Sequence, residues 1–383
     1  MKKCIIIPDS FKGTMSSEEV CNIEYRLLSE AFPECRFVTL PVADGGEGTL
    51  SCFLHGMNGE RIKVSVQDAF GWEIESGYGR FGDFAVIEMA AAAGMVTNNL
   101  RDPMTSSTYG VGQLIDHAVS SGCGKILIGL GGSCTNDAGT GMAAALGTVF
   151  YNEQGEAFMP TGESLDEIVR IDNSVTERKL AGIEISCMCD IDNPLYGENG
   201  AAYVFAPQKG ADEKQVELLD RNLRVFADTV LREMKIDISC IRGGGAAGGM
   251  GAGACAFLGA ELKKGIDYIL DIMEFDELLE GCDLVITGEG RLDMQSLMGK
   301  VASGVGRRAA ARGVPAVAVV GCISDEMKTT EARRRLNDVG IRKVYPASDG
   351  SGRFEEITES CRRDLEAAVG CMINDIYIGH FNF

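Results

Sequence analysis

Hydrophobic positions alternate between strand-like and helix-like spacing at the start of the chain. The continuous apolar run over residues 3–8 is typical of a strand that is buried on both faces. Apolar residues then recur at helical spacing over 16–31, where Ser16 and Glu19 fit a capping box. A second strand is expected over 37–42, and another helix follows it. This order predicts a parallel sheet that binds ligands at the carboxyl ends of its strands.

The same alternation returns near the end of the chain, whereas the middle differs. Short segments from 64 to 90 are punctuated by glycine, which indicates antiparallel pairing. The predicted fold class is therefore α/β, with a Rossmann-like parallel-sheet domain built from both chain ends and a mixed α/β domain inserted into it. The expected domains are residues 1–65 with 282–383, and residues 66–281. Late strands are expected over 283–287, 315–321 and 343–345, and a closing helix over 355–376.

Glycine is unusually frequent, at 49 of 383 residues or about 13%, against a usual ~7%. It clusters where predicted elements end, in the segments 45–48, 129–132, 243–253 and 288–290. Such loops let backbone amides approach a phosphate closely. Each cluster alone could serve only a tight turn, but four together favour a site for an anionic small molecule.

Charge and cysteine usage limit the possible partners. With 36 basic and 56 acidic side chains the net charge is −20, which disfavours nucleic acid or an anionic membrane surface. The apolar runs are too short to span a bilayer or to form a signal-peptide core. The 14 cysteines are scattered without a CxxC pair, as in a reducing compartment. We expect a cytoplasmic monomer or homodimer.

Several familiar catalytic motifs are missing. The sequence has neither a Walker A loop nor a G-x-G-x-x-G motif after the first strand. Its three histidines lie within predicted helices or near the end of the chain, which makes a Ser-His-Asp hydrolase or a histidine-ligated zinc enzyme improbable.

Carboxylates and cations gather instead where predicted strands end. This inventory suits phosphoryl transfer, which needs oxygen ligands for Mg²⁺, cations for the transferring group and a carboxylate for the acceptor alcohol. Any one acid could instead cap a helix, and we expect this for Asp137 but not for Asp190. The group comprises Asp9, Lys12, Asp44, Asp190, Asp192, Asn193, Glu289, Arg291, Asp293 and Lys300.

Seven stretches that contain these residues carry a family resemblance. They are 9–16, 41–49, 129–137, 189–195, 205–210, 244–249 and 287–293, followed by Gly299-Lys300. In this order, over residues 5 to about 321, the chain resembles the bacterial glycerate kinase family that phosphorylates D-glycerate. It departs from the family at Ala302, where a proline is usual, and at Gly243-Gly244, where Pro-Gly is usual. Neither departure removes a charged group.

The resemblance, combined with strand-end position, suggests a role for each candidate. Asp190 would orient and deprotonate the acceptor hydroxyl, and Arg291 offers a planar fork for the carboxylate of glycerate. The catalytic candidates are Asp190, Lys12 and Lys300; the substrate-binding candidates are Ser10, Asp44, Arg291 and Asn193. The nucleotide-binding candidates are Gly131, Gly132, Ser133, Thr135 and Asn136; the metal-binding candidates are Glu289 and Asp293.

The implied reaction is ATP- and Mg²⁺-dependent phosphorylation of D-glycerate in glyoxylate or sugar-acid breakdown, with 2-phosphoglycerate as the favoured product. Three alternatives stay open: a kinase that forms 3-phosphoglycerate, a nicotinamide-dependent sugar-acid oxidoreductase, and a non-catalytic sugar-acid sensor. The chain lacks the glycine fingerprint that is expected of such an oxidoreductase. A sensor would not need Asp190, Asp293 and Lys300 together.

Overall fold

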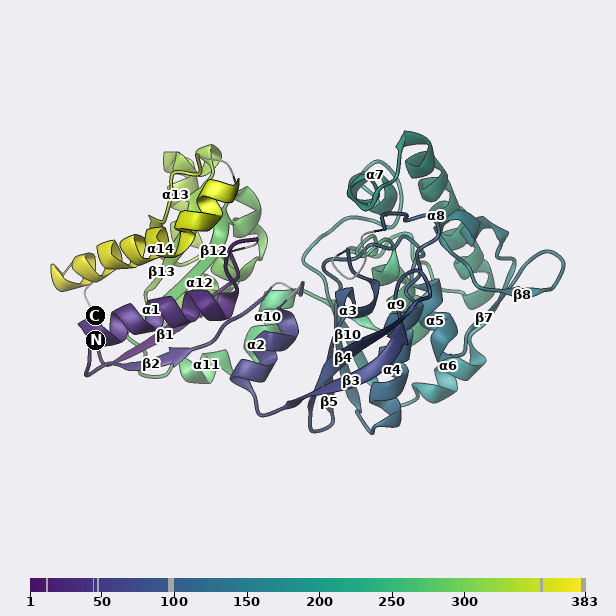
Figure 1. Ribbon diagram of the computed structural model, residues 1–383, viewed down its shortest axis with the longest axis horizontal. Helices are drawn as coiled ribbons and strands as arrows, with labels where there is room; N and C mark the ends of the chain where they lie inside the picture. The colour runs from purple at the N-terminus through teal and green to yellow at the C-terminus, as the bar shows by residue number, and fades with distance from the viewer. Residues whose placement is uncertain (12, 44, 47, 96–99, 352–353, 380–383) are drawn as a thin grey trace. The chain divides into compact units, whose positions relative to one another are not determined.

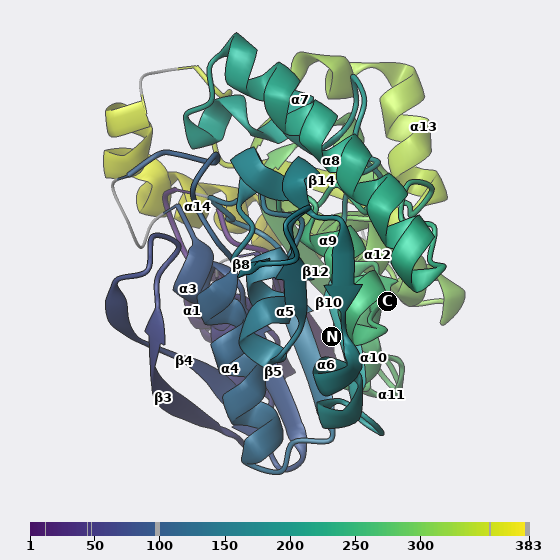
Figure 2. The ribbon, with the colours of Figure 1, turned by 90° about the vertical axis from the view of Figure 1, so that its right-hand side faces the viewer.

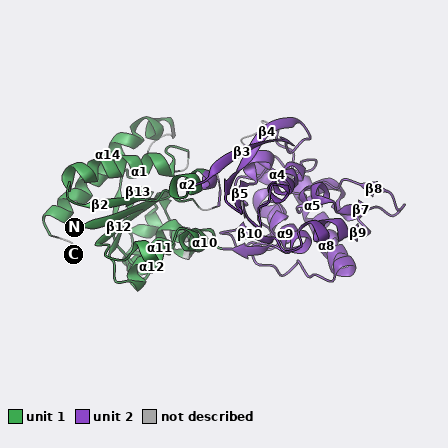
Figure 3. Ribbon diagram, turned by 90° about the horizontal axis from the view of Figure 1, so that it is seen from below, with its two compact units in different colours: residues 1–44, 51–57, 264–383 green, residues 45–50, 58–263 purple. Residues whose placement is uncertain are grey.

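The computed structural model describes residues 1–11, 13–43, 45–46, 48–95, 100–351 and 354–379. The chain divides into two compact units (Figures 1 and 3). Unit 1 contains residues 1–44, 51–57 and 264–383, and unit 2 contains 45–50 and 58–263. Within the described ranges, no helix is both long and apolar enough to cross a membrane.

The sheet of unit 1 is parallel throughout and joins the two ends of the chain. Its strands lie in the order β2-β1-β12-β13-β14, which in chain order is 2-1-3-4-5. This is a doubly wound order of the flavodoxin-like type, and it reverses between β1 and β12. Ligands of such sheets bind beyond the strands' carboxyl ends at that reversal. The strands are β1 Lys3–Pro8, β2 Arg36–Thr39, β12 Leu284–Leu292, β13 Ala316–Ile323 and β14 Ile341–Pro346.

Helices cover both faces of this sheet (Figure 3). Helices α1 (Ser17–Ala31) and α14 (Phe354–Tyr377) pack on one face, and α12 (Val301–Ala311) packs on the other. Because both faces are covered, β1 is buried from Cys4 to Pro8 without alternation. The other helices of unit 1 are α10 Gly265–Ile272, α11 Phe275–Leu278, α13 Thr330–Asp338, η3 Met294–Met298 and η4 Asp325–Lys328; α2 (Thr49–Gly56) has its first two residues in unit 2.

The main sheet of unit 2 is mixed, in the order β11-β10-β6-β5-β4-β3. Strands β3, β4 and β5 pair antiparallel, whereas β5, β6, β10 and β11 run parallel. A small antiparallel sheet, β8-β7-β9, accompanies it. The strands are β3 Glu60–Gln67, β4 Glu73–Phe81, β5 Phe84–Glu88, β6 Lys125–Gly129, β7 Val149–Tyr151, β8 Ala157–Phe158, β9 Arg170–Asp172, β10 Glu184–Met188 and β11 Glu261–Lys263.

The helices of unit 2 enclose one hydrophobic core with this sheet. Helix α4 lies along β3, β4 and β5, as Figure 2 shows, and it packs closely against α5. The helices are α3 Ala90–Ala93, α4 Tyr109–Ser120, α5 Thr140–Leu146, α6 Ser174–Lys179, α7 Ala201–Phe205, α8 Glu213–Met234, α9 Met250–Leu258, η1 Gly162–Glu167 and η2 Pro207–Lys209.

The predicted α/β class is confirmed: one parallel sheet comes from both chain ends, and a mixed sheet comes from the middle. One strand was predicted too short, since β12 continues to Leu292 and places Glu289 and Arg291 on a strand. The limits of the compact units also differ from the expected boundaries, because β3 pairs with β4 in unit 2 and α10 packs on α12 in unit 1. A division into folding domains at 65/66 and 281/282 stays a prediction.

Candidate functional site

A cavity of about 470 Å³ opens in unit 1 where the strand order reverses. The carboxyl ends of β1 and β12 supply polar residues to its lining, and α14 contributes to the lining as well. Its charged and hydroxyl lining includes Asp9, Ser10, Glu289, Arg291, Asp293 and Lys300. With Asp364 of α14, the chain therefore brings two cations and four carboxylates to the place where the topology predicts a ligand.

The end of β1 is tied to β12 at this cavity. The Asp9 amide donates to the main-chain oxygen of Gly288 at 2.8 Å, which extends the pairing of the two strands. Asp9 is buried, and its Oδ1 accepts the amide of Ser10 at 2.6 Å. The Asp9 carboxylate thus fixes the turn that carries the Ser10 hydroxyl.

Glu289 is a buried carboxyl group with unmet hydrogen-bonding capacity. Its side chain is 5% exposed, and Oε1 has no hydrogen-bond partner within the described residues. Burial raises the pKa of Glu289 to about 7; the Ser296 hydroxyl and Lys300 oppose this shift, and Asp9 and Asp293 add to it. The cavity therefore contains a carboxyl group whose pKa lies close to neutral pH.

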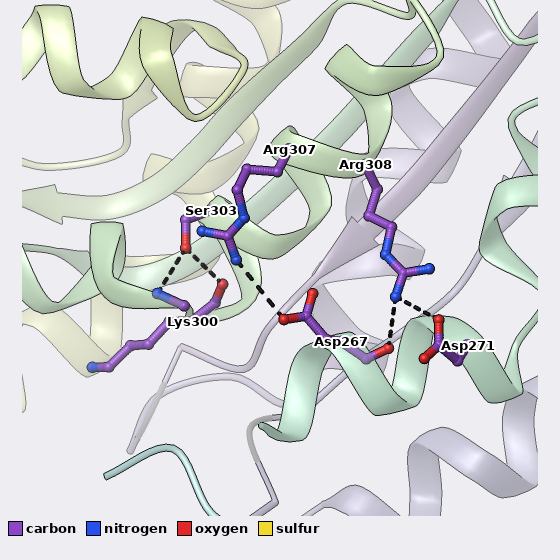
Figure 4. Close-up of polar contacts among 7 residues, drawn as sticks. Asp267, Asp271, Lys300, Ser303, Arg307 and Arg308 are labelled. Atoms are coloured by element: carbon purple, nitrogen blue, oxygen red, sulfur yellow. Dashed lines mark hydrogen bonds and ion pairs between the residues drawn. The ribbon is translucent and has the colours of Figure 1, made fainter. Parts of the chain in front are cut away.

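Lys300 stands at the start of α12, and the first turn of that helix fixes its backbone. The Ser303 hydroxyl accepts the amide of Gly299 at 3.2 Å and donates to the oxygen of Lys300 at 3.1 Å. Further along α12, Arg308 donates to the main-chain oxygen of Asp267 at 3.0 Å and pairs with Asp271 (Figure 4). These contacts anchor α12 to α10 and so hold the lysine at the cavity.

In unit 2, two glycine segments approach each other at the end of β6. The Gly131 amide donates to the oxygen of Gly45 at 3.1 Å. A Cβ at Gly129 would lie 2.5 Å from that same oxygen, and one at Gly131 would lie 2.5 Å from Cα of Gly46. Only glycine allows this approach.

The loop that follows is buried and polar. Asp137 accepts the amide and hydroxyl of Thr108 at 2.7 and 2.8 Å and the amides of Gly139 and Gly141 at 3.2 Å. Asp137 thus accepts an amide of the first turn of α5, as expected for it, although the N-cap position of that helix is Gly139. Thr135 and Asn136 are fully buried, and Oγ1 of Thr135 and both amide atoms of Asn136 lack partners within the described part of the chain.

Asp190 and Asn193 also lie in unit 2. Asp190 is partly buried just after β10. Asn193 has a structural contact, since its Nδ2 donates to the oxygen of Asn199 at 2.8 Å. Lys12 and Asp44 lie outside the described residues.

Of the residues to which the sequence analysis gave a role, the structure thus places five in one cavity of unit 1, beside Asp9: Ser10, Glu289, Arg291, Asp293 and Lys300. It also shows lining residues that the motifs did not suggest. Ile357, Cys361 and Asp364 of α14 face the cavity. Their spacing of four and three residues marks one face of a helix, a signal present in the sequence.

Comparison with known proteins assigns the chain to a family. A family model described as the glycerate kinase family matches residues 4–376. The chain belongs to the glycerate kinase family. It is accordingly a small-molecule kinase, and the family implies ATP as its phosphoryl donor and glycerate as its acceptor.

Relatives of this glycerate kinase resemble it over nearly their full length. A glycerate kinase of Bacillus cereus is 39% identical over 368 residues, 95% of each chain. The glycerate 2-kinase of Escherichia coli K12 is 41% identical over 358 residues, 92% of each chain. The crystal structure of "putative glycerate kinase 2" from Salmonella typhimurium LT2 superposes with a TM-score of 0.85, at 34% identity and 99% coverage of both chains.

Proposed function

We propose that this glycerate kinase transfers the γ-phosphoryl group of ATP to the C2 hydroxyl of D-glycerate, giving 2-phosphoglycerate and ADP. The observation that carries the proposal is the cavity at the strand-order reversal of unit 1, where Arg291 and Lys300 accompany four carboxylates. The name glycerate 2-kinase of the Escherichia coli relative supports the choice of hydroxyl.

The acceptor binds in this cavity through its carboxylate. Arg291 presents a planar guanidinium group that can donate two parallel hydrogen bonds to a carboxylate, which glycerol lacks. Ser10 supplies a hydroxyl group whose place is fixed by Asp9. Asn193 and Asp44 remain proposed substrate contacts.

Two carboxylates of the cavity suit a magnesium ion. Within the described ranges, no cluster of three or more histidine, cysteine or acidic side chains is placed to hold a metal. Mg²⁺ needs no such cage, because it usually binds one or two carboxylates together with water and substrate phosphates. The unpartnered Oε1 of Glu289 and the neighbouring Asp293 fit this pattern. When bound there, Mg²⁺ would neutralise charge on the transferring phosphoryl group.

The remaining roles follow the chemistry of phosphoryl transfer. Lys300 and Lys12 neutralise phosphate charge, and Asp190 takes the proton of the attacking hydroxyl as the new P–O bond forms and the bond to ADP breaks. Nucleotide phosphates bind the amides and hydroxyls of a loop in unit 2. That loop contains Gly131, Gly132, Ser133, Thr135 and Asn136.

A coupled assay of ADP release tests the class of reaction. The panel contains D-glycerate, L-glycerate, glycerol and lactate, each with ATP and magnesium, and NAD⁺ reduction is followed in parallel. We expect ADP release that depends on D-glycerate. NAD⁺ reduction instead would favour the oxidoreductase, and binding of glycerate without either reaction would favour the sensor.

Phosphorus NMR without proton decoupling tests the position of phosphorylation. In 2-phosphoglycerate one proton lies on the carbon next to the phosphate oxygen, so the signal is a doublet. In 3-phosphoglycerate there are two such protons, so the signal is a triplet. A triplet as the initial product would overturn the proposed C2 specificity.

A further inference from the structure

A lysine is buried in unit 2, in a motif to which the proposed reaction gives no role. Lys209 ends η2, and its side chain is only 2% exposed. Its Nζ donates a hydrogen bond to the main-chain oxygen of Thr135 at 2.7 Å. That oxygen belongs to the loop 131–136, which we propose binds the nucleotide phosphates.

Keeping an ammonium group in this place is unfavourable. Burial lowers the pKa of Lys209 to about 8, and the Cys134 thiol and the Asp137 carboxylate oppose the shift. Asp137 is already hydrogen-bonded to Thr108 and to the amides of Gly139 and Gly141. A neutral side chain could donate one hydrogen bond to Thr135 without this desolvation penalty, so the charge itself points to a role beyond packing.

Several polar groups near this contact lack hydrogen-bond partners among the described residues. An ammonium group offers three donors, and Lys209 uses one of them among the described residues. Thr135 Oγ1 and both amide atoms of Asn136 are likewise buried without partners in that part of the structure. Unpartnered buried groups are rare in folded proteins, and a concentration of them calls for an explanation such as a bound ligand or water.

A strained glycine segment holds the same loop from another side. The Ala138 amide donates to the oxygen of Gly248 at 3.0 Å, and a Cβ at Gly248 would lie 2.0 Å from the oxygen of Thr135. Two alanines at this contact, Ala138 and Ala247, have left-handed φ angles of 52° and 55°. Such strain persists only where the surrounding structure imposes it, and it is common at ligand sites.

We propose that Lys209 is a positioning residue for the nucleotide: its ammonium group fixes the Thr135 carbonyl and thereby the conformation of the phosphate-binding loop 131–136. The buried charge also favours an anionic ligand on that loop, because charge interactions are strong away from water. The ligand class is the phosphate chain of a nucleoside di- or triphosphate. This inference rests on the proposed role of the loop.

The test compares Lys209→Met with Lys209→Arg in the full chain. Calorimetric titration with Mg·ADP should show affinity reduced at least about tenfold by Lys209→Met and partly restored by Lys209→Arg, as expected for loss of a hydrogen bond from a charged group. The KM for ATP should rise while the KM for glycerate stays unchanged. Lys179→Met is the matched control, since Lys179 pairs with Asp116 at the surface of the same unit.

Hydrogen–deuterium exchange separates this inference from the proposed function. In the wild type, Mg·ADP should protect the peptide that covers the loop, and in Lys209→Met at saturating ADP this protection should be weaker. ADP binding without protection of the loop would contradict the proposed nucleotide site. Equal protection and affinity in wild type and Lys209→Met would overturn the role of Lys209 alone.

Folding is checked by circular dichroism before binding is measured. If Lys209→Met does not fold, Lys209→Gln replaces it, because glutamine keeps a donor for Thr135 and removes the charge. Failure of both variants to fold would show that Lys209 serves stability, and it would overturn the proposal.

Discussion

Arg291 is the residue that should separate glycerate from uncharged polyols. Its guanidinium group lines the cavity and is the natural partner for the acceptor carboxylate. We expect Arg291→Met to raise the KM for D-glycerate roughly 10- to 100-fold, the worth of a charge-assisted hydrogen bond, and to leave the KM for ATP nearly unchanged. Steady-state kinetics measures both. Arg335→Met is the control, since Arg335 pairs with Glu331 on exposed α13; an equal effect there would refute the assignment.

Asp190 is the proposed base, and substitution by asparagine preserves its shape while removing its charge. We expect turnover of Asp190→Asn to fall by roughly 10²–10⁴-fold, the usual contribution of general-base catalysis, with little change in the KM for glycerate. Asp192→Asn is the control, because Asp192 pairs with Arg242 at the surface. A variant at Asp190 that keeps its turnover but melts earlier would identify a structural turn residue.

The positions of some site residues were predictable from the sequence, because the carboxyl ends of parallel strands lie at one edge of a sheet. Ser10 and Lys300 line the same cavity, as this rule predicts, although almost 300 residues separate them in the chain. It did not predict the burial of Glu289, because the surrounding glycines indicated a loop. Pairing of Glu289 with Val320 and of Arg291 with Cys322 extends β12 instead, and a long-range pairing leaves no local signal.

At the scale of elements, helix α1 contains a buried carboxyl group that destabilises the folded state. Glu24 is fully buried, and neither of its oxygens has a hydrogen-bond partner within the described residues. Burial raises its pKa well above the ordinary value of about 4.5. Since the folded state holds this proton more tightly than the unfolded state, stability should fall as pH rises from about 4.5 toward the folded pKa.

We therefore expect Glu24→Gln to remove this part of the pH dependence. Denaturant unfolding at several pH values should show the variant gaining stability over the wild type as pH rises. Glu18→Gln, at an exposed position of the same helix, should not show this gain. A constant difference between Glu24→Gln and wild type from pH 5 to 8 would contradict the assignment.

Helix α12 depends on a close approach to α10. A Cβ at Gly304 would lie 2.7 Å from Cγ2 of Ile266, a stiff β-branched side chain. We expect Gly304→Ala to destabilise the protein by about 1–3 kcal/mol and to lower turnover, because α12 carries Lys300 at its start. Gly370→Ala is the matched control: its Cβ meets open space on α14 and should stabilise by about 0.5–1 kcal/mol. Thermal unfolding of both variants measures these two changes in stability.

Elements with strong local signals were predicted well. The capping box of Ser16 and Glu19 is formed at the start of α1, and the buried strand at residues 3–8 is β1. The three strands β7, β8 and β9 were missed, since two or three residues are too few to show a period. Helices α10 and α11 were missed as well. Helix α10 did carry a local signal, since its buried Ile266, Ile269 and Leu270 are spaced as on one face of a helix, whereas the four residues of α11 are too few to show a period.

At the scale of the whole molecule, the alternation at both chain ends correctly predicted that distant segments share one parallel sheet. The exact limits of the compact units were not predictable, because they depend on which sheet a strand such as β3 joins and which helix α10 packs against. The pairing of strands within a sheet depends on tertiary contacts, which are difficult to predict from a single sequence.

The central claim is that the cavity of unit 1 holds the hydroxy acid, and two of its own thiols report on it. Cys322 and Cys361 line the cavity, whereas Cys240 and Cys371 are exposed. Alkylation by iodoacetamide, followed by peptide mass spectrometry, gives a labelling rate for each cysteine with and without saturating D-glycerate. We predict several-fold slower labelling at Cys322 and Cys361 only, and no protection by glycerol. Unchanged labelling of these two thiols at saturating D-glycerate would contradict the account.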